Sequence, residues 1–570
     1  MPNNLSGGAS EPPSLEKRLP IALGLMMLVL LVSQYLFKPP QPPKTAKAPA
    51  EKQAVVQPRQ VPAAVDIPAT ASAGAAGQIT AATEQITDID TDLYHLVFTN
   101  RGGLVKSWVL KRYADTAGKP LQLVHQTAFG EQSTNVPLPF AIEIKDQRIT
   151  VDPNTVLYKV TPTSGGMGVD YSYSDGHTSI QKSFGFSKDS YLANVHSAVV
   201  TNGTPVAHFL EWRGGFGDPK AFRAASNGRT VRYDATAGKL IEKTVKDAKD
   251  GATTDGGNYT FGGVEDNFFA AVALPASGSL EVRTYSDPLK VPGEDKPQPS
   301  IGGGLSTGAE NEFTLFVGPK DLNILKKVNP KLTQIIDWGF FGILAKPLFL
   351  WLNWTADHWT GNYGWAIVVV TLIINLVLFP LKFSSLRSAR KMQRLQPQIK
   401  AINERYKNIK INDPKKAEQN QEVMALYKKG GVNPVGGCLP LLIQMPFLYA
   451  FYRVLSIAIE LRHAPWLWVS DLSAPETIAI HILPVVLVIT QFLTQRMTPS
   501  PGVDPNQQKM MLFMPLVFGY IFWFLSSGLV LYYLTSNLVG IAQQLVINRF
   551  MPAPPVEAPA KAPVKKVSRK

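Results

Sequence analysis

Long runs of uncharged apolar residues occur near the N-terminal end of the 570-residue chain and in roughly its last third. A hydrocarbon core of about 30 Å is crossed by about 20 residues of α-helix. One such run covers residues 19–37, and the others lie at 363–381, 436–459, 477–493, 510–525 and 529–547. The pattern predicts six membrane-spanning helices, the last five of which form the core of an α-helical polytopic membrane region.

The first apolar run follows Lys17 and Arg18, which places residues 1–18 in the cytoplasm. A cleaved signal peptide is the alternative, but the run is long for one and no small-x-small cleavage site follows it closely. Residues 38–79 are rich in Pro, Ala, Gln and Lys and too poor in large apolar groups to form a core. We therefore expect a membrane anchor followed by a flexible linker.

Between residues 80 and 325 the pattern changes to short segments in which apolar and polar residues alternate, for example at 94–98, 104–110 and 192–200. A period of two is typical of strands with one buried face. Turn-forming pairs separate these segments: Gly102-Gly103, Asp175-Gly176, Asn202-Gly203 and Asn227-Gly228. The pattern predicts an inserted all-β sandwich domain, which lies outside the cytoplasm because it follows the first membrane helix.

Residues 331–360 combine aliphatic and aromatic side chains and contain Pro347. The aromatic residues include Trp338, Phe340, Phe341, Trp351, Trp354 and Trp359. Trp side chains favour the boundary between lipid headgroups and acyl chains. We expect an amphipathic helix that lies on the outer membrane surface and leads into the first core span.

The distribution of charge predicts the orientation of the spans. Segment 382–435 holds thirteen Lys or Arg residues against four acids, whereas segment 460–476 holds one Arg among three acids. Positively charged loops stay in the cytoplasm, so 382–435 is cytoplasmic. The loop at 494–509 and the basic tail at 548–570 are then cytoplasmic as well. The chain is expected in a bacterial inner membrane with both termini inside, and with the β domain and the 460–476 loop in the periplasm.

The cytoplasmic segment 382–435 contains two helical stretches, 384–406 and 414–428, separated by a short break. Apolar residues recur at helical spacing on the first stretch: Leu386, Met392, Leu395, Ile399 and Ile402. We interpret the segment as an antiparallel helical hairpin that projects from the membrane. The alternative is a solvated, charged linker.

The overall composition changes this picture little. The formal net charge is +14, but the excess Lys and Arg lie beside the apolar runs and in the tail. This distribution indicates that the charges orient the spans in the membrane and do not bind nucleic acid. Cys438 is the only cysteine, and the eight histidines are scattered without zinc-ligand spacing. The sequence has neither a G-x-x-x-x-G-K-[ST] phosphate loop nor a G-x-S-x-G elbow. We expect no enzymatic reaction, no metal, no cofactor and no specific nucleic-acid binding.

Polar residues in the core spans occur in pairs four residues apart, which places both members on one helical face. The pairs are Thr371 with Asn375, Gln491 with Gln495, and Tyr533 with Asn537. Polar groups are costly against lipid, so these faces are expected to point at one another or at a wet cavity. The alternative is interhelical hydrogen bonding that only holds the bundle together.

Arg453 is the one arginine inside a predicted core span, seven residues before Glu460 and so about 10 Å from the outer end of the helix. An arginine at this depth costs about 2.5–3.5 kcal/mol on insertion scales and needs a partner, water or a route to the surface. Tyr449 and Pro446 share its helical face. The alternative to a functional role is that Arg453 extends outward beside Glu460.

Several motifs resemble the YidC/Oxa/Alb family of membrane protein insertases, and its didermal bacterial branch in particular. They are Ile335-Ile336-Asp337-Trp338-Gly339, Lys346-Pro347-Leu348-Phe349, Gly361-Asn362-Tyr363-Gly364-Trp365, Leu395-Gln396-Pro397, Met424-Ala425-Leu426-Tyr427, Val432-Asn433-Pro434-Val435-Gly436-Gly437-Cys438, Leu442-Ile443-Gln444-Met445-Pro446, Glu460-Leu461-Arg462 and Ser527-Gly528-Leu529-Val530-Leu531-Tyr532-Tyr533. The resemblance covers the last 240 residues or so with high specificity. The anchor, linker and β domain fit the same architecture more loosely.

This resemblance implies a chaperone that inserts and folds membrane proteins without a nucleotide, through a hydrophilic groove open to the cytoplasm and to lipid. The groove residues implied on matched positions, together with the polar residues that share those faces, are Thr371, Asn375, Arg453, Gln495, Tyr532, Tyr533 and Asn537. An apolar path beside the groove would include Met445, Pro446 and Tyr449. The implied partners are nascent membrane proteins, the lipid bilayer, the Sec translocon and the ribosome, the last through the basic tail.

The chain departs from the family pattern at one groove position. The family usually places an arginine in the groove on the second span, and the matching position here is Asn375. We hypothesise that the positive charge has moved to Arg453 on the third span and still projects into the same cavity.

Two other classes of protein are weighed against an insertase. A secondary transporter would suit a polar site at mid-membrane, but no internal repeat or pair of broken helices is evident. A membrane-tethered carbohydrate-binding or carbohydrate-processing protein would rest on the β domain alone, and no carboxylate pair stands out there.

Overall fold

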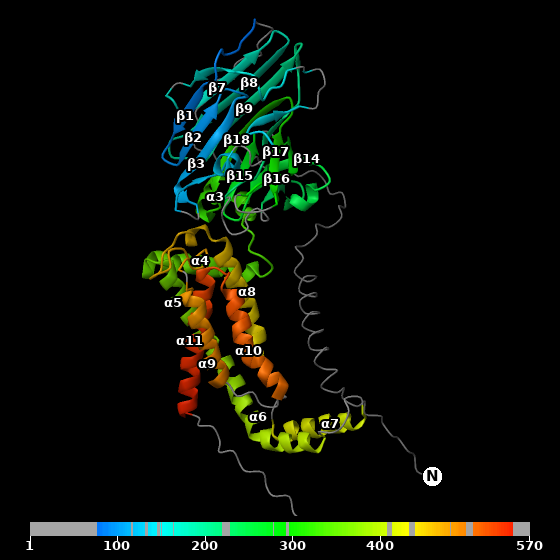
Figure 1. Ribbon diagram of the computed structural model, residues 1–570, viewed down its shortest axis with the longest axis vertical. Helices are drawn as coiled ribbons and strands as arrows, with labels where there is room; N and C mark the ends of the chain where they lie inside the picture. The colour runs from blue at the N-terminus through cyan, green and yellow to red at the C-terminus, as the bar shows by residue number, and fades with distance from the viewer. Residues whose placement is uncertain are drawn as a thin grey trace, which may run out of the picture.

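The structure is a computed structural model that describes residues 77–550, except 116–117, 131–134, 145–148, 150, 164, 219–227, 277–278, 292–295, 407–412, 432–438, 479 and 498–504. The predicted anchor at 19–37, most of the linker at 38–79 and the tail beyond residue 550 lie outside the described residues. Figure 1 shows a β domain at one end of the molecule and a helical region at the other.

The β domain contains two sheets. The first has four antiparallel strands in the order β1 (Ile86–Asp90), β2 (Tyr94–Thr99), β3 (Leu104–Ala114) and β4 (Pro120–Gln122). The second follows the order β5 (Ala141–Glu143), β11 (Phe209–Trp212), β17 (Gln298–Ser306), β16 (Ser279–Leu289), β14 (Thr253–Glu265), β15 (Phe269–Pro275), β18 (Glu310–Pro319), β9 (Leu192–Thr201), β8 (Thr178–Phe186), β7 (Gly168–Ser174) and β6 (Lys159–Pro162). Three more strands join it at the side: β10 (Thr204–Pro205), β12 (Arg229–Asp234) and β13 (Lys239–Thr244).

The predicted all-β architecture is confirmed. Strand β9 alternates strictly between partly buried and buried residues, as a period of two requires. Asn202 and Gly203 have φ values of 50° and 74° and form the tight turn between β9 and β10, because left-handed backbone is easiest for Asn and Gly. Asn227 lies outside the described residues.

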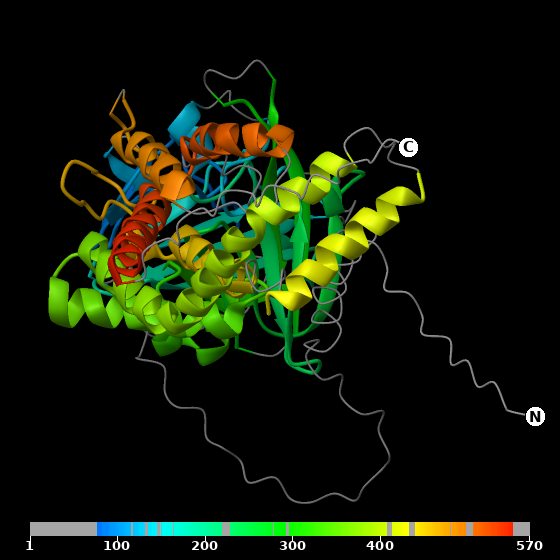
Figure 2. The same ribbon diagram turned by 90° about the horizontal axis from the view of Figure 1, so that it is seen from below.

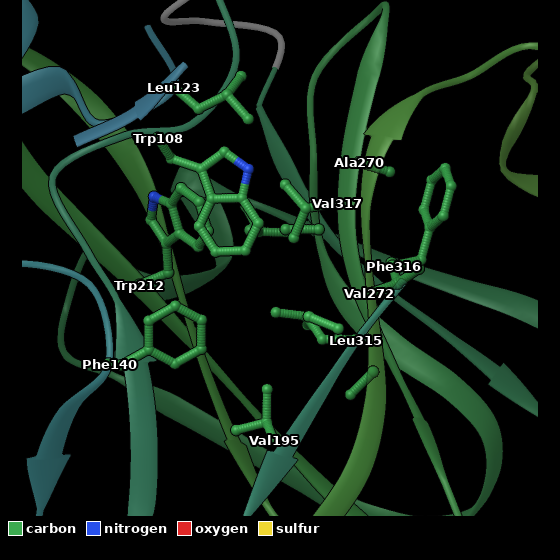
Figure 3. Close-up of a cluster of buried hydrophobic side chains, with 14 of the residues drawn as sticks. Trp108, Leu123, Phe140, Val195, Trp212, Ala270, Val272, Leu315, Phe316 and Val317 are labelled. Carbon is green, nitrogen blue, oxygen red and sulfur yellow. The ribbon is translucent and has the colours of Figure 1, made fainter. Parts of the chain in front are cut away.

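The core of the β domain is built around large aromatic side chains from both sheets. Trp108 of β3 is fully buried, with its ring centroid 5.7 Å from Trp212 of β11 and 6.2 Å from Phe140. Figure 3 shows these rings beside Val195 and Leu315, which belong to the second sheet. Packing between the two sheets therefore holds the domain together.

The helical region begins where the last strand ends. Its elements are α3 (Leu322–Val328), η4 (Pro330–Ile335), α4 (Gly342–Thr355), the π-helical turn η5 (Ala356–Thr360), α5 (Tyr363–Val377), α6 (Phe379–Arg405), α7 (Lys415–Lys429), α8 (Leu439–Ile457), η7 (Ile459–Leu461), α9 (Ile482–Met497), α10 (Pro505–Phe522) and α11 (Ser527–Phe550). Figures 1 and 2 show α6 and α7 projecting side by side from the rest of the helices. Within the described residues α11 is long and apolar enough to cross a membrane, and α4 with η5 forms a second such stretch with α5, bent by 114°.

The structure differs from the expected helix at 331–360. A short 3-10 helix, η4, ends at Ile335, and α4 begins only at Gly342. Asp337 accepts a hydrogen bond from the Gly339 backbone N–H at 2.9 Å, and Gly339 has a φ of 70°. This turn breaks the helix at Trp338, Phe340 and Phe341, so that only the later aromatic residues lie on α4 and η5. The hydrophobic pattern does not encode this break.

The β domain contacts the helical region through the segment that follows α8. Arg462 forms a buried ion pair with Asp218 and donates a hydrogen bond to the Ala114 carbonyl at the end of β3, at 2.8 Å. Its guanidinium also lies 5.5 Å from the ring centroid of Phe268. Both charges are almost fully buried, with 4% and 0% of their side chains exposed. A pair of this kind depends on both partners, because a single buried charge is costly.

We expect Asp218→Asn to lower the free energy of unfolding by about 3 kcal/mol, because Arg462 would remain buried without its counter-charge. The change is measured as a loss of thermal stability of the purified full-length chain in detergent. Arg101→Gln is the matched control, since Arg101 pairs with Glu84 on the surface of the β domain with 51% of its side chain exposed. The control should change stability by about 1 kcal/mol or less. Equal effects of the two variants would contradict the role assigned to Asp218.

Candidate functional site

Asn375 is the centre of a buried polar cluster between α5 and α11. Its side-chain N–H donates to the Thr371 carbonyl at 2.8 Å, and its side-chain oxygen accepts from Ser536 of α11 at 3.3 Å. Gln543, also on α11, donates to the Asn375 backbone carbonyl at 3.2 Å. Asn375 is 3% exposed and Ser536 7%. The predicted polar face formed by Thr371 and Asn375 on α5 therefore points at α11.

A positive charge reaches this cluster from the first turn of α6. The ammonium group of Lys382 donates to the side-chain oxygen of Asn375 at 2.6 Å. Only Leu378 separates α5 from α6, so the helical path continues far enough to bring Lys382 back over Asn375. The arrangement holds a cation among amide and hydroxyl groups.

Helices α9 and α11 are also joined through polar side chains. Asn537 of α11 donates to the side chain of Gln491 on α9 at 2.8 Å. Gln495 lies one helical turn beyond Gln491 on the same helix and is partly buried. Helix α11 therefore makes polar contacts with α9 through Asn537 and with α5 at Asn375.

The two predicted groove tyrosines face different helices. The Tyr532 ring stacks on Phe451 of α8 with centroids 4.3 Å apart and is 2% exposed. The Tyr533 ring lies 5.0 Å from Phe522 of α10 and is partly buried. The structure therefore brings Asn375 and Asn537 into polar contacts, whereas Tyr532 is part of the apolar packing.

The predicted apolar path lies on a face of α8 that is partly uncovered. Met445 is 51% exposed and Tyr449 is 38% exposed, while Pro446 is partly buried. Tyr452 continues the same exposed set at 41%. The opposite side of α8 packs into the helical core through Ala450, Val454 and neighbouring residues.

The hypothesis that Arg453 replaces the missing groove charge is corrected by its contacts. The Arg453 Nε–H donates to the Asp337 backbone carbonyl at 2.8 Å, and the guanidinium forms an ion pair with the Asp337 carboxylate. Arg453 thus faces the turn before α4, whereas Asn375 faces α11 and Lys382. The reason is that Asp337 supplies a counter-charge for this partly buried arginine.

Sequence reasoning missed two residues of this arrangement, Lys382 and Asp337. The apolar pattern places Lys382 in the cytoplasmic loop, although Lys382 lies seven residues after Asn375 and so on the same helical face. The spacing of seven residues is the sequence signal that could have placed Lys382 beside Asn375. Asp337 gave no comparable signal, because its contact with Arg453 joins positions 116 residues apart.

One ionisable group near the outer end of α8 has a perturbed pKa. Burial raises the pKa of Glu460 in η7 to about 7, and the nearby carboxylates of Asp321 and Asp357 act in the same direction. One oxygen of Glu460 is buried without a hydrogen-bond partner. The described residues contain no group of three or more His, Cys, Asp or Glu side chains that could hold a metal ion.

Comparisons with known proteins agree across the whole described region. The family model described as 60Kd inner membrane protein matches residues 354–554, and the model described as YidC periplasmic domain matches residues 86–351. A membrane protein insertase YidC from Geotalea daltonii is 33% identical over 565 residues, which is 95% of this chain and 100% of the relative. Another, from Geobacter sp. (strain M21), is 34% identical over 480 residues, 81% of this chain and 85% of the relative.

A solved structure described as an active YidC insertase with its first transmembrane domain resolved is 20% identical to this chain. The match covers 82% of this chain and 93% of that chain, with a TM-score of 0.35.

The two parts of the molecule and the matches to each define a bacterial inner-membrane protein that carries a large periplasmic β domain. Its helical region holds a buried polar cluster between otherwise apolar helices. The chain belongs to the family of the membrane protein insertase YidC. The family resemblance inferred from the sequence motifs is confirmed.

The raised pKa of Glu460 predicts a pH-dependent stability. The folded chain holds this proton up to about pH 7, whereas the unfolded chain releases it near pH 4.5, so stability falls as pH rises through that window. We expect the loss to amount to roughly 3 kcal/mol. Glu460→Gln, which cannot ionise, should remove this part of the pH dependence in thermal unfolding of the full-length chain between pH 5 and 8. An unchanged pH profile in the variant would contradict the assignment.

Proposed function

We propose that this chain inserts membrane proteins by receiving the polar, translocated end of a substrate at the cluster around Asn375. The observation that carries the proposal is the Lys382 ammonium held 2.6 Å from the Asn375 side chain, beside α5 and α11, which both also pack into the apolar helical core. The cluster forms the wall of a hydrophilic groove that opens toward the cytoplasm, from which Lys382 enters. Nascent membrane proteins are the substrates, and the surrounding lipid receives them.

The energetic argument starts from the cost of polar groups in lipid. Gln543 of α11 donates to the Asn375 backbone carbonyl on α5, and Asn537 of α11 donates to Gln491 on α9. A substrate backbone that passes these groups exchanges hydrogen bonds with them and avoids the several kcal/mol that each unsatisfied polar group costs in hydrocarbon. The cluster therefore lowers the barrier without any chemical step.

The length of α9 supports the same interpretation. This helix has 16 residues and so rises only about 24 Å. This is shorter than a typical hydrocarbon core of about 30 Å. A protein with short spans thins the surrounding bilayer, and a thinner bilayer reduces the distance over which a polar substrate end lacks water.

The apolar part of the substrate is proposed to leave along α8 and α10. On α8, Met445 and Tyr449 are exposed, and on α10 the exposed apolar residues are Phe513, Met514, Leu516, Val517, Phe518, Tyr520 and Ile521. Exposed apolar surface of this extent is unusual unless lipid or a partner covers it. A hydrophobic substrate helix can pack there while its polar end remains in the groove.

The proposal also covers topology and partners. The chain has six spans with both termini in the cytoplasm, and α6 and α7 form a cytoplasmic hairpin. It acts alone or beside the Sec translocon. The hairpin is supported by a small apolar cluster of Met392 and Ile399 on α6 with Tyr427 on α7. The Arg405 guanidinium also pairs with Glu422 across the two helices at 2.7 Å. The basic tail, which lies beyond the described residues, is proposed to contact the ribosome.

We expect Lys382→Gln to slow the insertion of substrates whose translocated end is acidic by about tenfold, the factor given by about 1.4 kcal/mol of charge attraction. The measurement is protease protection of a single-spanning substrate after insertion into vesicles that contain the purified full-length chain. Substrates with an uncharged end should be affected much less, and Lys382→Arg should retain most of the activity.

Lys400→Gln is the matched control, because Lys400 is an exposed lysine on the same helix. It should insert acidic substrates at nearly the wild-type rate. An equal loss in Lys382→Gln and Lys400→Gln, or an equal loss for acidic and uncharged substrates, would remove the specific role of Lys382.

The proposed topology can be checked by labelling single cysteines in a Cys438→Ser background. A membrane-impermeant thiol reagent added to the periplasmic side should label Lys239→Cys on the β domain and Leu467→Cys in the loop after α8. It should not label Lys400→Cys on α6. Labelling of Lys400→Cys from the periplasm would contradict the orientation.

A further inference from the structure

The ion pair between Arg453 and Asp337 joins α8 to the turn that precedes α4. Arg453 makes two contacts to the same residue, one to the backbone carbonyl and one to the carboxylate. The turn has little room for movement, because a Cβ placed on Gly339 would lie 3.1 Å from the Arg453 Cγ and 3.1 Å from the Tyr449 hydroxyl oxygen. The guanidinium and the turn are therefore closely fitted.

A row of alternating charges continues from this pair into the β domain. The carboxylate of Asp337 lies 3.9 Å from the guanidinium of Arg229 on β12. Arg229 pairs with Glu265 at 2.5 Å, and Glu265 lies 3.1 Å from the ammonium of Lys320. Glu265 is fully buried and Lys320 nearly so. Asp337 is thus held by cations from both sides, one on the β domain and one on α8.

A second contact lies nine residues further along the same segment. Arg462 is held by Asp218 and the Ala114 carbonyl of the β domain. Between the two arginines, Ile457 and Ile459 are buried in the same hydrophobic cluster as Ile335 and Ile336 at the base of the β domain. The outer end of α8 is therefore fixed by two ion pairs and by one apolar contact between them.

Part of the exposed apolar face of α8 lies beside Arg453. Tyr449 and Tyr452 precede Arg453 in the chain by four residues and by one, and they are 38% and 41% exposed. Phe341, in the turn before α4, packs edge-on against Tyr449 with centroids 5.6 Å apart. A shift at Asp337 would therefore move the tyrosines that contact whatever passes along α8.

We propose that Asp337 and Arg453 are positioning residues for insertion, through which the β domain holds the outer end of α8 at a fixed place. This inference rests on the proposed function, since it assumes that substrates leave along α8. It differs from the charge role of Lys382, because the pair acts on the placement of α8 and not on the charge of the substrate. Substrates with acidic and with uncharged ends should need it equally.

The test measures placement and insertion in the same variants of the full-length chain. Spin labels are attached at Tyr452→Cys on α8 and Glu281→Cys, an exposed position on β16, in a Cys438→Ser background. We expect a single narrow distance distribution in the parent chain and a broadened one in Asp337→Asn and Arg453→Gln. Each variant should insert an uncharged-end substrate about fivefold more slowly, within the range of couplings seen between contacting residues.

Two further variants separate positioning from general loss of folding. Arg453→Lys keeps the charge but lacks the planar guanidinium whose separate N–H groups reach the Asp337 carbonyl and carboxylate together, so it should recover more than half of the rate. The double variant Asp337→Asn/Arg453→Gln should be no slower than the slower single variant, because both changes remove one interaction. Arg101→Gln, at the opposite end of β3 from the contact with Arg462, is the control and should leave distance and rate as in the parent chain.

An unchanged distance distribution in Asp337→Asn would overturn the proposal even if insertion fell. A broadened distribution with normal insertion of uncharged substrates would overturn the functional half of it. If Lys382→Gln inserts acidic substrates normally while the Asp337 variants behave as expected, the proposed role of the Lys382 charge is wrong. The positioning role of Asp337 and Arg453 then stands.

Discussion

The buried ion pair between Arg462 and Asp218 is the interaction on which the relation between the two halves of the molecule depends. Both side chains have left water, so their free energies are tied to each other and to the Ala114 carbonyl that shares the guanidinium. Arginine suits this role because its planar group donates in several directions at once. Once the pair is made, the end of α8 is fixed against β3, and Ile457 and Ile459 become part of the hydrophobic cluster of the β domain. The β domain therefore determines where the end of α8 lies.

A second constraint acts within the helical region, where polar groups must find partners inside the protein. Asn375 meets this requirement with Ser536, Gln543 and Lys382, and Gln491 meets it with Asn537. Such a network holds the helices together and also keeps polar groups at a depth where lipid would exclude them. The structural and the functional interpretations of these residues are compatible, because a substrate can exchange its own hydrogen bonds for those of the network.

The hydrophobic pattern of the sequence was enough to predict the β domain and the faces of the helices. Period-two alternation located β9, and four-residue spacing placed Thr371 with Asn375 on a buried face. The pattern could not predict the break before α4, because the hydrogen bond from the Gly339 N–H to Asp337 depends on a local turn. The pattern also could not pair Arg453 with Asp337. Helical periodicity gives the face on which a side chain lies, but it does not identify the distant segment that contacts this face. The apolar run ends at residue 381, so hydrophobicity alone does not place Lys382 on the helical face that carries Asn375.

The positions of the two cations follow from the same electrostatic rule. An arginine on α8 with Asp337 beside it is neutralised locally, so its field falls off quickly and it contributes to structure. Lys382 contacts the neutral oxygen of Asn375, so more of its charge remains available to an approaching group. Lysine also has a longer flexible stem and a single charged centre, which lets it follow a moving carboxylate better than a guanidinium held by two bonds. The chain thus assigns its fixed cation to the outer end of α8 and its adaptable cation to the polar cluster, and the identity of each partner, acid or amide, decides which role the cation has.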